Sequence, residues 1–249
     1  MARPSTELGM GKTVAIVQAR MGSERFPGKM MSLLGGYPVL EWVLRRLLRA
    51  RLLDDIILAT TTLSRDDPLA RVASRLGVRC FRGDEHDVLG RFVAAAKLVG
   101  ADNVVRICAD NPFVDPDEID RLVSFFSSAG CDYACNHQDR LGSGYADGFG
   151  GEILSVNLLQ SISIETTDPT HREHVTLYLW EHEGKKSFRL MAPKSPASLA
   201  YPDLRFDIDI QNDFRLINKL IDEYNVSFLS SAKEIIEAVV KKQEVLCNE

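Results

Sequence analysis

The sequence predicts an α/β fold built on a doubly wound, mostly parallel sheet. Short apolar runs alternate along the chain with longer segments that repeat apolar residues at helical spacing. Short apolar runs, such as the charge-free Val14–Val17, are typical of strands buried on both faces of a parallel sheet. Their alternation with helices gives the βαβαβ order of parallel connections. The predicted strands cover Val14–Val17, Asp55–Thr60, Val78–Phe81 and Asn103–Cys108.

The predicted helices lie between and after these strands. Residues 39–53 carry apolar side chains at positions 40, 43, 44, 47 and 48 with arginines between them, which indicates an amphipathic helix. Asp115 precedes Pro116 and is a good N-cap. The helices are expected at Val39–Leu53, at Asp66–Leu76 with Asp66 or Ser64 as cap, at Val88–Val99, at Pro116–Ala129, at Thr170–Glu181 with Thr167 or Asp168 as cap, at Asn212–Tyr224 and at Ser231–Lys242.

Length and composition limit the class of protein. The 249 residues, 45% of them hydrophobic, suit one large α/β domain or one domain with an appended lobe. A net charge of -5 argues against nucleic acid as a partner. Apolar runs stay well short of the ~18 residues of a membrane span, and residues 1–12 lack the apolar core of a signal peptide. We therefore expect a cytoplasmic protein without a membrane partner, preceded by a flexible tail at residues 1–12.

The cysteines and histidines predict neither a disulfide framework nor a zinc site. Five cysteines are an odd number, and Cys131 and Cys135 are too far apart for a C-x-x-C pair. His137, His171 and His174 are scattered rather than paired at zinc-finger spacing. We expect reduced thiols, and we expect His171 and His174 to contact substrate or to stabilise the fold.

Three cations follow the first predicted strand in a glycine-rich loop. Arg20, Arg25 and Lys29 lie just beyond the carboxyl end of Val14–Val17, and this end of a strand is where open α/β sheets bind ligands. Three positive charges on an otherwise acidic chain favour a small polyanion. A solvated basic loop is the alternative that the cations alone leave open.

The loop matches neither of the common phosphate motifs. A P-loop has four residues between its first glycine and the Gly-Lys pair, whereas five separate Gly22 from Gly28 and Met30 follows Lys29. No G-x-G-x-x-G fingerprint follows the strand either. The sequence therefore predicts a phosphate loop of another kind, in which glycines let the backbone approach the ligand.

Carboxylates are predicted to face these cations. Asp110 follows the strand Asn103–Cys108, and so it should reach the same crevice; a turn-forming Asp is the alternative. A strand at Arg205–Ile210 would place Asp207 and Asp209 on one face and apolar residues on the other. Adjacent carboxylates repel unless a cation relieves them, although an ordinary half-exposed edge strand would also explain the pattern.

A long loop is expected at Asn136–Gly151, which holds five glycines and few apolar residues. Loops of this length in compact domains are usually functional or disordered. We interpret this one as a lid that faces the substrate.

Taken together, the motifs resemble the cytidylyltransferases that make CMP-activated 3-deoxy sugar acids, namely CMP-Kdo synthetases and acylneuraminate cytidylyltransferases. The similarity spans residues 13 to 224 and is closest to the spore coat polysaccharide biosynthesis branch. It rests on residues 18–29, 59–62, 81–84, 87–92, 105–112, 172–176 and 205–209. The resemblance implies a Rossmann-like fold of the nucleotide-diphospho-sugar transferase type. It implies a single domain at 13–249 and, within it, a lobe at about 131–202 that binds sugar and forms a homodimer.

The resemblance also implies the reaction. The anomeric hydroxyl of an acidic 3-deoxy sugar, a ulosonic or nonulosonic acid, would attack the α-phosphorus of CTP and release pyrophosphate. Arg20 and Lys29 would hold the triphosphate. Asp110 and Asp209 would hold Mg²⁺, together with Asp207 if the chain follows the acylneuraminate branch.

Further roles follow from the same resemblance. Nucleotide binding is assigned to Gln18, Ala19, Arg20, Gly22, Ser23, Lys29, Ala59, Thr60, Arg82, Gly83 and Arg106. Contact with the sugar acid is assigned to Arg25, Tyr145, Glu152, Arg172, Glu173 and His174.

The sequence departs from the family pattern at four positions. Ala109 replaces a common glycine, Asp207 and Ile210 replace threonines of the spore coat branch, and Gln211 replaces its proline. These changes leave the sugar undetermined. Two other functions remain open, a nucleotide-sugar pyrophosphorylase or glycosyltransferase on the same scaffold and a non-catalytic nucleotide- or sugar-binding module.

Overall fold

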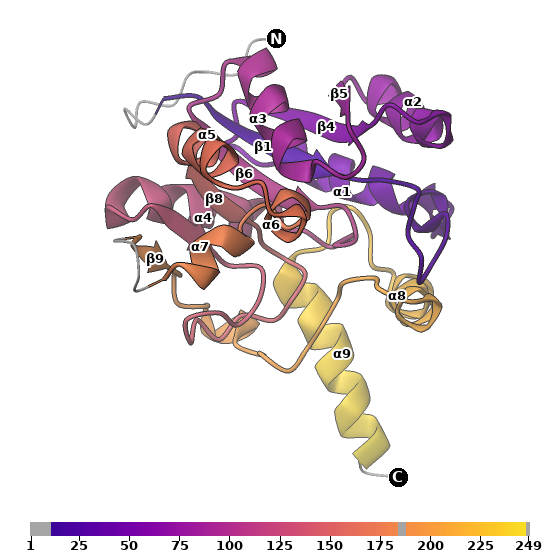
Figure 1. Ribbon diagram of the computed structural model, residues 1–249. Coiled ribbons are helices and arrows are strands. Elements are labelled where there is room, and N and C mark those ends of the chain that lie inside the picture. Colours follow the sequence, from indigo (N-terminus) through magenta and orange to yellow (C-terminus); the bar gives the residue numbers. More distant parts are fainter. Residues whose placement is uncertain (1–10, 184–187, 248–249) are drawn as a thin grey trace.

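A seven-stranded sheet forms the centre of the computed structural model, which describes residues 11–183 and 188–247 (Figure 1). The first four strands in the order below are mutually parallel, and β8 is antiparallel to both of its neighbours. This arrangement confirms the predicted α/β class. The sheet order is β5 (Arg79–Gly83), β4 (Asp55–Thr61), β1 (Thr13–Gln18), β6 (Asn103–Cys108), β8 (Glu152–Ser155), β7 (Tyr133–Cys135) and β9 (Leu190–Met191). A separate hairpin joins β2 (Leu33–Leu34) and β3 (Tyr37–Pro38).

Strand β1 lies within the sheet and is buried on both faces. Val14, in register with Asp55 of β4 and Val104 of β6, has no exposed surface, and the same is true of the next three residues, through Val17. A run that contacts a helix layer on each side needs apolar residues at every position. The strand ends at Gln18, and the chain therefore leaves the sheet at its carboxyl edge with Arg20.

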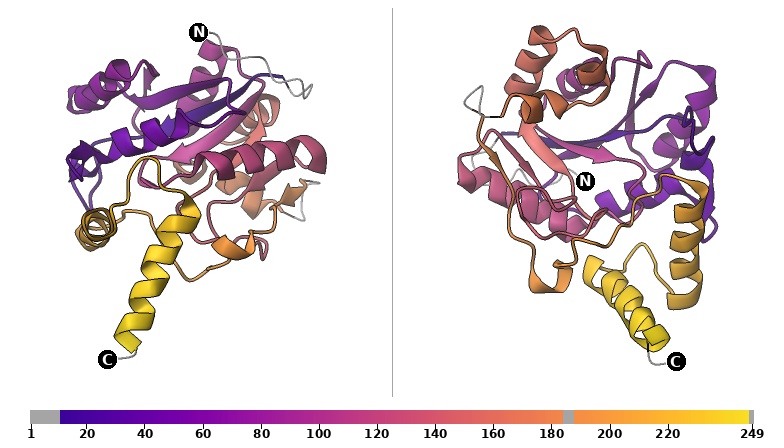
Figure 2. Two further views of the ribbon diagram at one scale, coloured as in Figure 1. Left: turned by 180° about the vertical axis from the view of Figure 1, so that it is seen from behind. Right: turned by 60° about the horizontal axis from the view of Figure 1, so that its bottom comes forward.

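Helices cover both faces of the sheet (Figure 2). Ala15 and Val17 contribute to one core cluster, and Val14 and Ile16 to the other. The first cluster includes side chains of α1 (Val39–Leu47), α2 (Asp67–Arg75), α4 (Pro116–Ala129), α8 (Gln211–Tyr224) and α9 (Ala232–Cys247). The second includes side chains of α3 (Val88–Val99), α5 (Val156–Glu165) and α7 (Leu177–Glu181). The short helices are α6 (Pro169–Glu173), η1 (Lys29–Met31), η2 (Ser64–Asp66) and η3 (Ala197–Leu199).

Three caps were predicted from the sequence, and two of them form as expected. The Asp115 carboxylate accepts hydrogen bonds from two backbone N–H groups in the first turn of α4, and that of Asp168 accepts one from Thr170 at the start of α6. Asp66 occupies the N-cap position of α2 but makes no capping hydrogen bond, because its carboxylate accepts from Thr61 and from the backbone N–H of Met21 instead.

Three predicted helices have the wrong extent, and one of them is α9, which ends at Cys247 instead of Lys242. Helix α1 ends at Leu47 instead of Leu53, because the backbone N–H groups of Arg51 and Leu52 donate to the carboxylate of Asp120 in α4. The expected helix at residues 170–181 is broken into α6 and α7. Val175 lies in the break and is fully buried in the second core cluster.

The predicted strand at Arg205–Ile210 is also wrong. These residues form only an isolated bridge between Arg205 and Asp147, and the backbone N–H of Ile208 donates to the carbonyl of Asp110. The alternation of faces is nevertheless correct for Phe206 and Ile208, which are buried. The segment crosses the carboxyl ends of the strands instead of joining the sheet.

The predicted loop at residues 136–151 contains neither helix nor strand, but its centre is packed, since Tyr145 and Phe149 are fully buried. Residues 1–10 of the predicted tail lie outside the described residues. Lys12 is fixed in place, because its backbone N–H donates to Asp102 at 2.6 Å.

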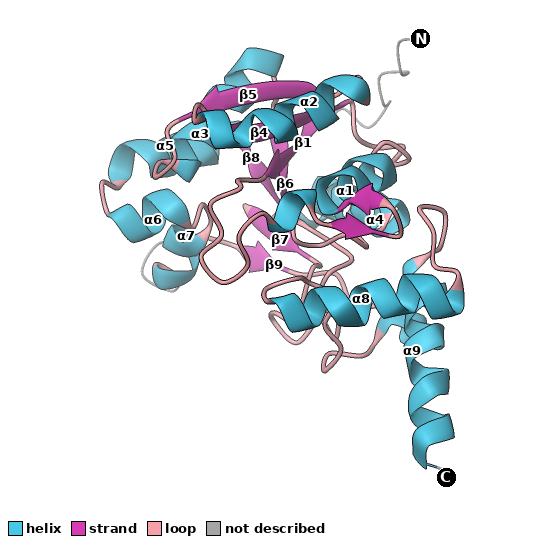
Figure 3. Cartoon of the chain, turned by 90° about the vertical axis from the view of Figure 1, so that its right-hand side faces the viewer, coloured by secondary structure: helices cyan, strands magenta, loops and turns pink. Residues whose placement is uncertain are grey.

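Helices α8 and α9 lie beyond the sheet, and the last part of α9 projects from the body (Figure 3). None of the helices in the described ranges combines the length and the apolar character that crossing a membrane requires. The four described cysteine side chains are free thiols, as predicted, and they are Cys80, Cys108, Cys131 and Cys135.

Candidate active site

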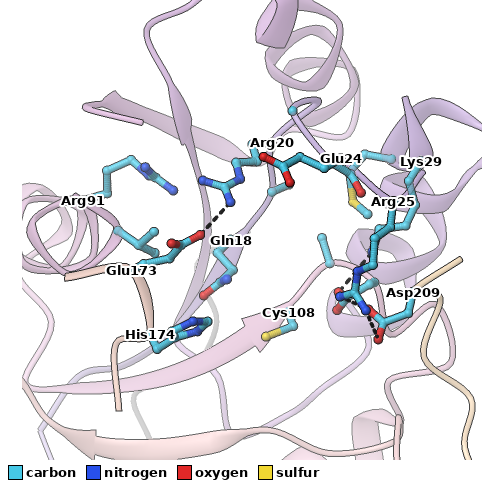
Figure 4. Close-up of a pocket in the computed structure, with 17 residues that line it drawn as sticks. Gln18, Arg20, Glu24, Arg25, Lys29, Arg91, Cys108, Glu173, His174 and Asp209 are labelled. Carbon is cyan, nitrogen blue, oxygen red and sulfur yellow. Dashed lines mark hydrogen bonds and ion pairs between the residues drawn. The ribbon is translucent and has the colours of Figure 1, made fainter. Parts of the chain in front are cut away.

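A cavity of about 590 Å³ opens at the carboxyl ends of β1 and β6 (Figure 4). Gln18 and Cys108, the last residues of these two strands, lie in its wall. The loop after β1, the turn after β6, helices α3 and α6 and the segment before α8 supply the rest. The lining residues are Gln18, Ala19, Arg20, Gly22, Ser23, Glu24, Arg25, Lys29, Met30, Val88, Arg91, Cys108, Ala109, Asp110, Glu173, His174 and Asp209.

The structure brings most of the predicted site residues together in this cavity. They come from segments that are far apart in the sequence, and all three cations of the loop are among them. The predicted residues that line the cavity are Gln18, Ala19, Arg20, Gly22, Ser23, Arg25, Lys29, Asp110, Glu173, His174 and Asp209.

Lys29 is the most deeply placed of the three cations. Gly28 has a φ of 76°, which an L residue rarely adopts, and this turn directs the chain into η1 with Lys29 facing inward. Only 8% of Lys29 is exposed. Its Nζ donates to Oδ2 of Asp110 at 3.2 Å and to the carbonyl of Ile208 at 2.5 Å. The loop after β1 is thereby joined to the turn after β6 and to the 205–210 segment.

The two arginines are also paired with carboxylates. Arg25 donates from both terminal nitrogens to Asp209, at 3.0 and 3.2 Å, and Arg20 donates to Glu173 at 2.7 Å. A polyanion in the cavity would compete with these carboxylates for the cations. Asp110 and Asp209 are the cavity residues that could then hold a metal cation.

Negative charge is concentrated beside these two aspartates. Burial, followed by the nearby charge of Asp207, raises the pKa of Asp147 to about 7. Asp207 lies outside the cavity lining and pairs with Arg205 at 2.6 and 3.0 Å. Burial disfavours the charged form of Asp147, and the charges of Asp207 and Asp110 add to this shift in its pKa. In the described ranges no group of three or more His, Cys, Asp or Glu residues could hold a metal, and so a metal at Asp110 and Asp209 would need further ligands.

Arg106 and Glu152 form a buried ion pair just behind the cavity wall. Arg106 donates to Glu152 at 2.7 Å and to the side-chain oxygen of Gln18 at 3.1 Å. Although burial alone would raise it, the charge of Arg106 lowers the pKa of Glu152 to about 2. Arg106 and Glu152, predicted to bind nucleotide and sugar, do not line the cavity themselves. Arg106 instead orients Gln18, which lines the cavity, and Glu152 holds Arg106 in place.

Several other predicted residues also lie outside the lining, and the side chains of two of them, Thr60 and Arg82, make hydrogen bonds within the fold. Thr60 donates to Asp66, and Arg82 donates to Asp67 and to the carbonyl of Thr61. The predicted residues outside the lining are Ala59, Thr60, Arg82, Gly83, Arg106, Tyr145, Glu152, Arg172 and Asp207.

Two of the predicted sugar contacts belong to this group. The hydroxyl of the fully buried Tyr145 donates to Glu118 at 2.7 Å. Arg172 donates to Ser163 and to Asp87, the N-cap of α3. Their side chains therefore connect helices and loops that surround the cavity.

Sequence reasoning missed Arg91 as a site residue. Its guanidinium group lies in the cavity wall near Arg20 (Figure 4), although only 3% of the residue is exposed. The residue is part of the 87–92 motif, but the motif does not show which way a side chain in the first turn of a helix points. Val88 and Cys108, which line the cavity too, gave no chemical signal in the sequence.

Comparisons with known proteins agree with this geometry. The sequence model of the cytidylyltransferases matches residues 14–242. The chain is 33% identical over 232 residues to the spore coat polysaccharide biosynthesis protein SpsF of Bacillus subtilis, covering 91% of this chain and 93% of that one. It is 36% identical over 117 residues to the 3-deoxy-manno-octulosonate cytidylyltransferase of Bdellovibrio bacteriovorus, covering 46% of each.

Solved structures show the same fold. A cytidylyltransferase from Leptospira borgpetersenii superimposes with a TM-score of 0.85 at 29% identity and covers 96% of this chain and 98% of its own. These matches confirm the resemblance found in the motifs. Since the family extends over nearly the whole chain and its cations and carboxylates meet in one cavity, this protein belongs to the cytidylyltransferase family and is a nucleotidyltransferase.

Proposed function

We propose that this enzyme transfers CMP from CTP to a hydroxyl group of an acidic 3-deoxy sugar and releases pyrophosphate, as a step in the biosynthesis of a surface polysaccharide or glycan. The observation that carries the proposal is the cavity in which Arg20, Arg25 and Lys29 face Asp110 and Asp209. The printed functions of two relatives, spore coat polysaccharide biosynthesis and 3-deoxy-manno-octulosonate cytidylyl transfer, support the acceptor class.

The proposed reaction is a displacement at phosphorus. The acceptor oxygen forms a bond to the α-phosphorus of CTP while the bond from that phosphorus to the oxygen bridging the β-phosphate breaks. The hydroxyl proton passes to solvent, and pyrophosphate leaves with the bridging oxygen. Such reactions are accelerated mainly by positioning and by neutralisation of charge. Lys29 suits this role because its ammonium group is fixed by Ile208 before the nucleotide binds.

Mg²⁺ fits the residues at this point of the cavity. It prefers a few carboxylate oxygens together with water and phosphate oxygens, which matches two aspartates beside a triphosphate. Asp110 and Asp209 would hold the ion, and the ion would supply neutralisation of phosphate charge when bound. Asp207, with Arg205 as its partner, would stabilise the segment that carries Asp209.

The acceptor is proposed to lie beside α6. Glu173 and His174 reach the cavity from the end of this helix and are exposed there. The side chain of Arg25 is 66% exposed at the same cavity, and its guanidinium could bind the carboxylate of an acidic sugar once Asp209 is released.

We further propose that the chain forms a homodimer through residues 131–202. Strand β9 ends the described sheet order, and large apolar side chains of this region, among them Leu141 and Met191, are exposed. An obligate interface usually buries more than ~2,000 Å². Light scattering at micromolar protein should give twice the chain mass. A monomer with full activity would exclude the dimer.

The proposed function is tested by mixing the protein with Mg²⁺, each of the four nucleoside triphosphates and a panel of acidic and neutral sugars. We expect pyrophosphate release only with CTP and an acidic 3-deoxy sugar. Release with another base would favour a pyrophosphorylase of the same scaffold. If no combination reacted while CTP still bound, a non-catalytic binding module would be the better description.

A further inference from the structure

One hydrogen-bond donor in the cavity wall has no partner in the fold. Gln18 ends β1 in register with Cys108 of β6, and the residue is partly exposed in the cavity. Its side-chain oxygen accepts a hydrogen bond from Nε of Arg106 at 3.1 Å. Its amide nitrogen donates to no atom of residues 11–183 and 188–247. A ligand in the cavity can therefore supply an acceptor to this donor.

The orientation of the amide follows from its partner. The oxygen and the nitrogen of a glutamine side chain are similar in shape, and so their hydrogen bonds decide which atom faces which neighbour. A guanidinium group has donors only, so the atom of Gln18 that faces Arg106 must be the oxygen. The NH2 group of Gln18 is therefore directed away from Arg106, which lies behind the cavity wall.

A buried network holds Arg106, and through it Gln18, in place. The side chain of Arg106 is 13% exposed and donates from Nη1 to Oε2 of Glu152 at 2.7 Å. The hydroxyl of Thr176 donates to the same carboxylate oxygen at 3.0 Å. Because these contacts form without a ligand, the donor of Gln18 is oriented in advance and loses little entropy when it forms a hydrogen bond.

The position of Gln18 indicates which substrate it meets. Thr176, the far end of the network, lies just after Glu173 and His174, which line the cavity. In Figure 4, Gln18 lies on the same side of the cavity as His174. Lys29, proposed to hold the triphosphate, lies on the opposite side. Gln18 is therefore placed beside the acceptor, which is proposed to lie at α6.

The chemistry of an amide also suits a sugar better than a phosphate. Phosphate oxygens form their strongest hydrogen bonds with cations, and Arg20, Arg25 and Lys29 supply these in the cavity. The NH2 group of Gln18 is neutral and can only donate. The hydroxyl oxygens of a sugar are neutral acceptors and match it.

We propose that Gln18 is a specificity-determining residue for the acceptor, with its NH2 group donating to one hydroxyl oxygen of the acidic sugar. This inference rests on the proposed function and adds a residue that selects among sugars. It differs from the nucleotide contact that the family resemblance implies for Gln18. A sugar without that hydroxyl would leave the donor without a partner, and a site built for a hydrogen bond disfavours such a ligand.

The test compares the wild type with Gln18→Met, because methionine is similar in length and removes the donor. Isothermal titration with CTP, in the absence of an acceptor, should give the wild-type affinity. Transfer of CMP at saturating CTP should show kcat/KM for the acidic sugar lowered about twofold to tenfold, as expected for the loss of one neutral hydrogen bond.

Acceptor analogues that each lack one hydroxyl group make the test sharper. For the analogue that lacks the partner of Gln18, the wild type and Gln18→Met should have equal kcat/KM, because the hydrogen bond is already missing. For the other analogues the variant should stay below the wild type by the same factor as for the complete sugar. Such non-additivity identifies a direct contact, whereas a structural effect of the substitution would lower kcat/KM for every analogue.

Two further variants complete the experiment. Gln160→Met makes the same exchange at a partly exposed position of α5 outside the cavity lining, and it should leave both CTP binding and kcat/KM at the wild-type value. If Gln18→Met does not fold, Gln18→Asn replaces it and is read by the same criteria, because the shorter side chain withdraws the donor by one methylene group.

The proposal is overturned if kcat/KM for the acidic sugar stays at the wild-type value in Gln18→Met, if CTP binding weakens by the same factor, or if every analogue loses equally. Failure of the proposed function is seen in the wild type instead, which would then transfer CMP to no acidic 3-deoxy sugar. If the wild type uses another acceptor, the same comparison with that acceptor decides the role of Gln18. If it uses none, both proposals are wrong.

Discussion

Lys29 differs from the arginines of its loop in how deeply it lies. Its side chain is 9% exposed, whereas the side chains of Arg20 and Arg25 are 34% and 66% exposed. Although Arg20 and Lys29 belong to the same glycine-rich loop of the sequence, Lys29 is therefore a buried residue. Its ammonium group joins three segments of the chain, and it has a structural role as well as a proposed catalytic one.

This difference gives a prediction for two alanine variants. Arg20→Ala and Lys29→Ala should each lower kcat/KM for CTP about tenfold to a hundredfold, because each removes a charge-assisted contact with phosphate. Lys29→Ala should also lower the free energy of unfolding by about 1–3 kcal/mol, since the carbonyl of Ile208 and Asp110 lose their donor. Steady-state kinetics and urea unfolding measure the two effects.

Arg71→Ala, which removes an exposed cation of α2, is the matched control and should change neither quantity. Wild-type kinetics for both Arg20→Ala and Lys29→Ala would support the solvated-loop alternative. Unchanged stability of Lys29→Ala would show that the buried contacts of Lys29 contribute little to the fold.

At the scale of elements, Asp115 connects three helices. It caps α4, it accepts a hydrogen bond from the backbone N–H of Ala232 at the start of α9, and it lies 3.6 Å from the buried guanidinium of Arg46 in α1. Burial lowers the pKa of Arg46 to about 10, and the charge of Asp115 opposes this shift. The carboxylate therefore stabilises a buried cation and two helix starts.

We predict that Asp115→Ala lowers the free energy of unfolding by about 3–5 kcal/mol, because it leaves a buried charge without its partner. Asp117→Ala in the same turn removes an exposed pair with Arg51 and should cost less than about 1 kcal/mol. Urea unfolding of both variants gives the comparison. Similar losses for the two would mean that the Arg46 pair adds nothing beyond an ordinary surface contact.

Helices whose ends depend on local signals could be predicted from the sequence. Helices α3 and α4 have the predicted bounds, because an Asp cap and a glycine in the left-handed region define their ends. The end of α1 depends on Asp120, which lies 69 residues from Arg51. Val175, in the break between α6 and α7, is fully buried in the second core cluster. Contacts between residues that lie far apart in the sequence cannot be recognised from the spacing of its apolar residues.

In the molecule as a whole, the candidate site could likewise be predicted only in part from the sequence. The topology of the sheet predicts that the loop after β1 and the turn after β6 share one edge, and this places Arg20, Lys29 and Asp110 together. It does not predict which cation pairs with which carboxylate. The side chain of Arg91 could not be placed either, because its helical position is equally compatible with a solvent-facing arginine.

The whole fold is needed to bring Asp110 and Asp209 into one cavity. Asp110 follows β6, whereas Asp209 belongs to a segment near the end of the chain that crosses the sheet edge. Asp207, two residues earlier, lies outside the lining with Arg205 as its partner. Asp207 and Asp209 are therefore a matched pair of positions for testing where the reaction takes place, because only Asp209 lines the cavity.

The most direct test of the active site's location is an assay that follows the transfer of labelled CMP from α-phosphate-labelled CTP to an acidic sugar. The assay compares the wild type with three variants in the presence of Mg²⁺. We predict that Asp110→Asn and Asp209→Asn nearly abolish turnover, whereas Asp207→Asn retains most of it. Transfer that survives in Asp209→Asn but fails in Asp207→Asn, or that proceeds equally well without a divalent metal, would contradict this assignment of the active site.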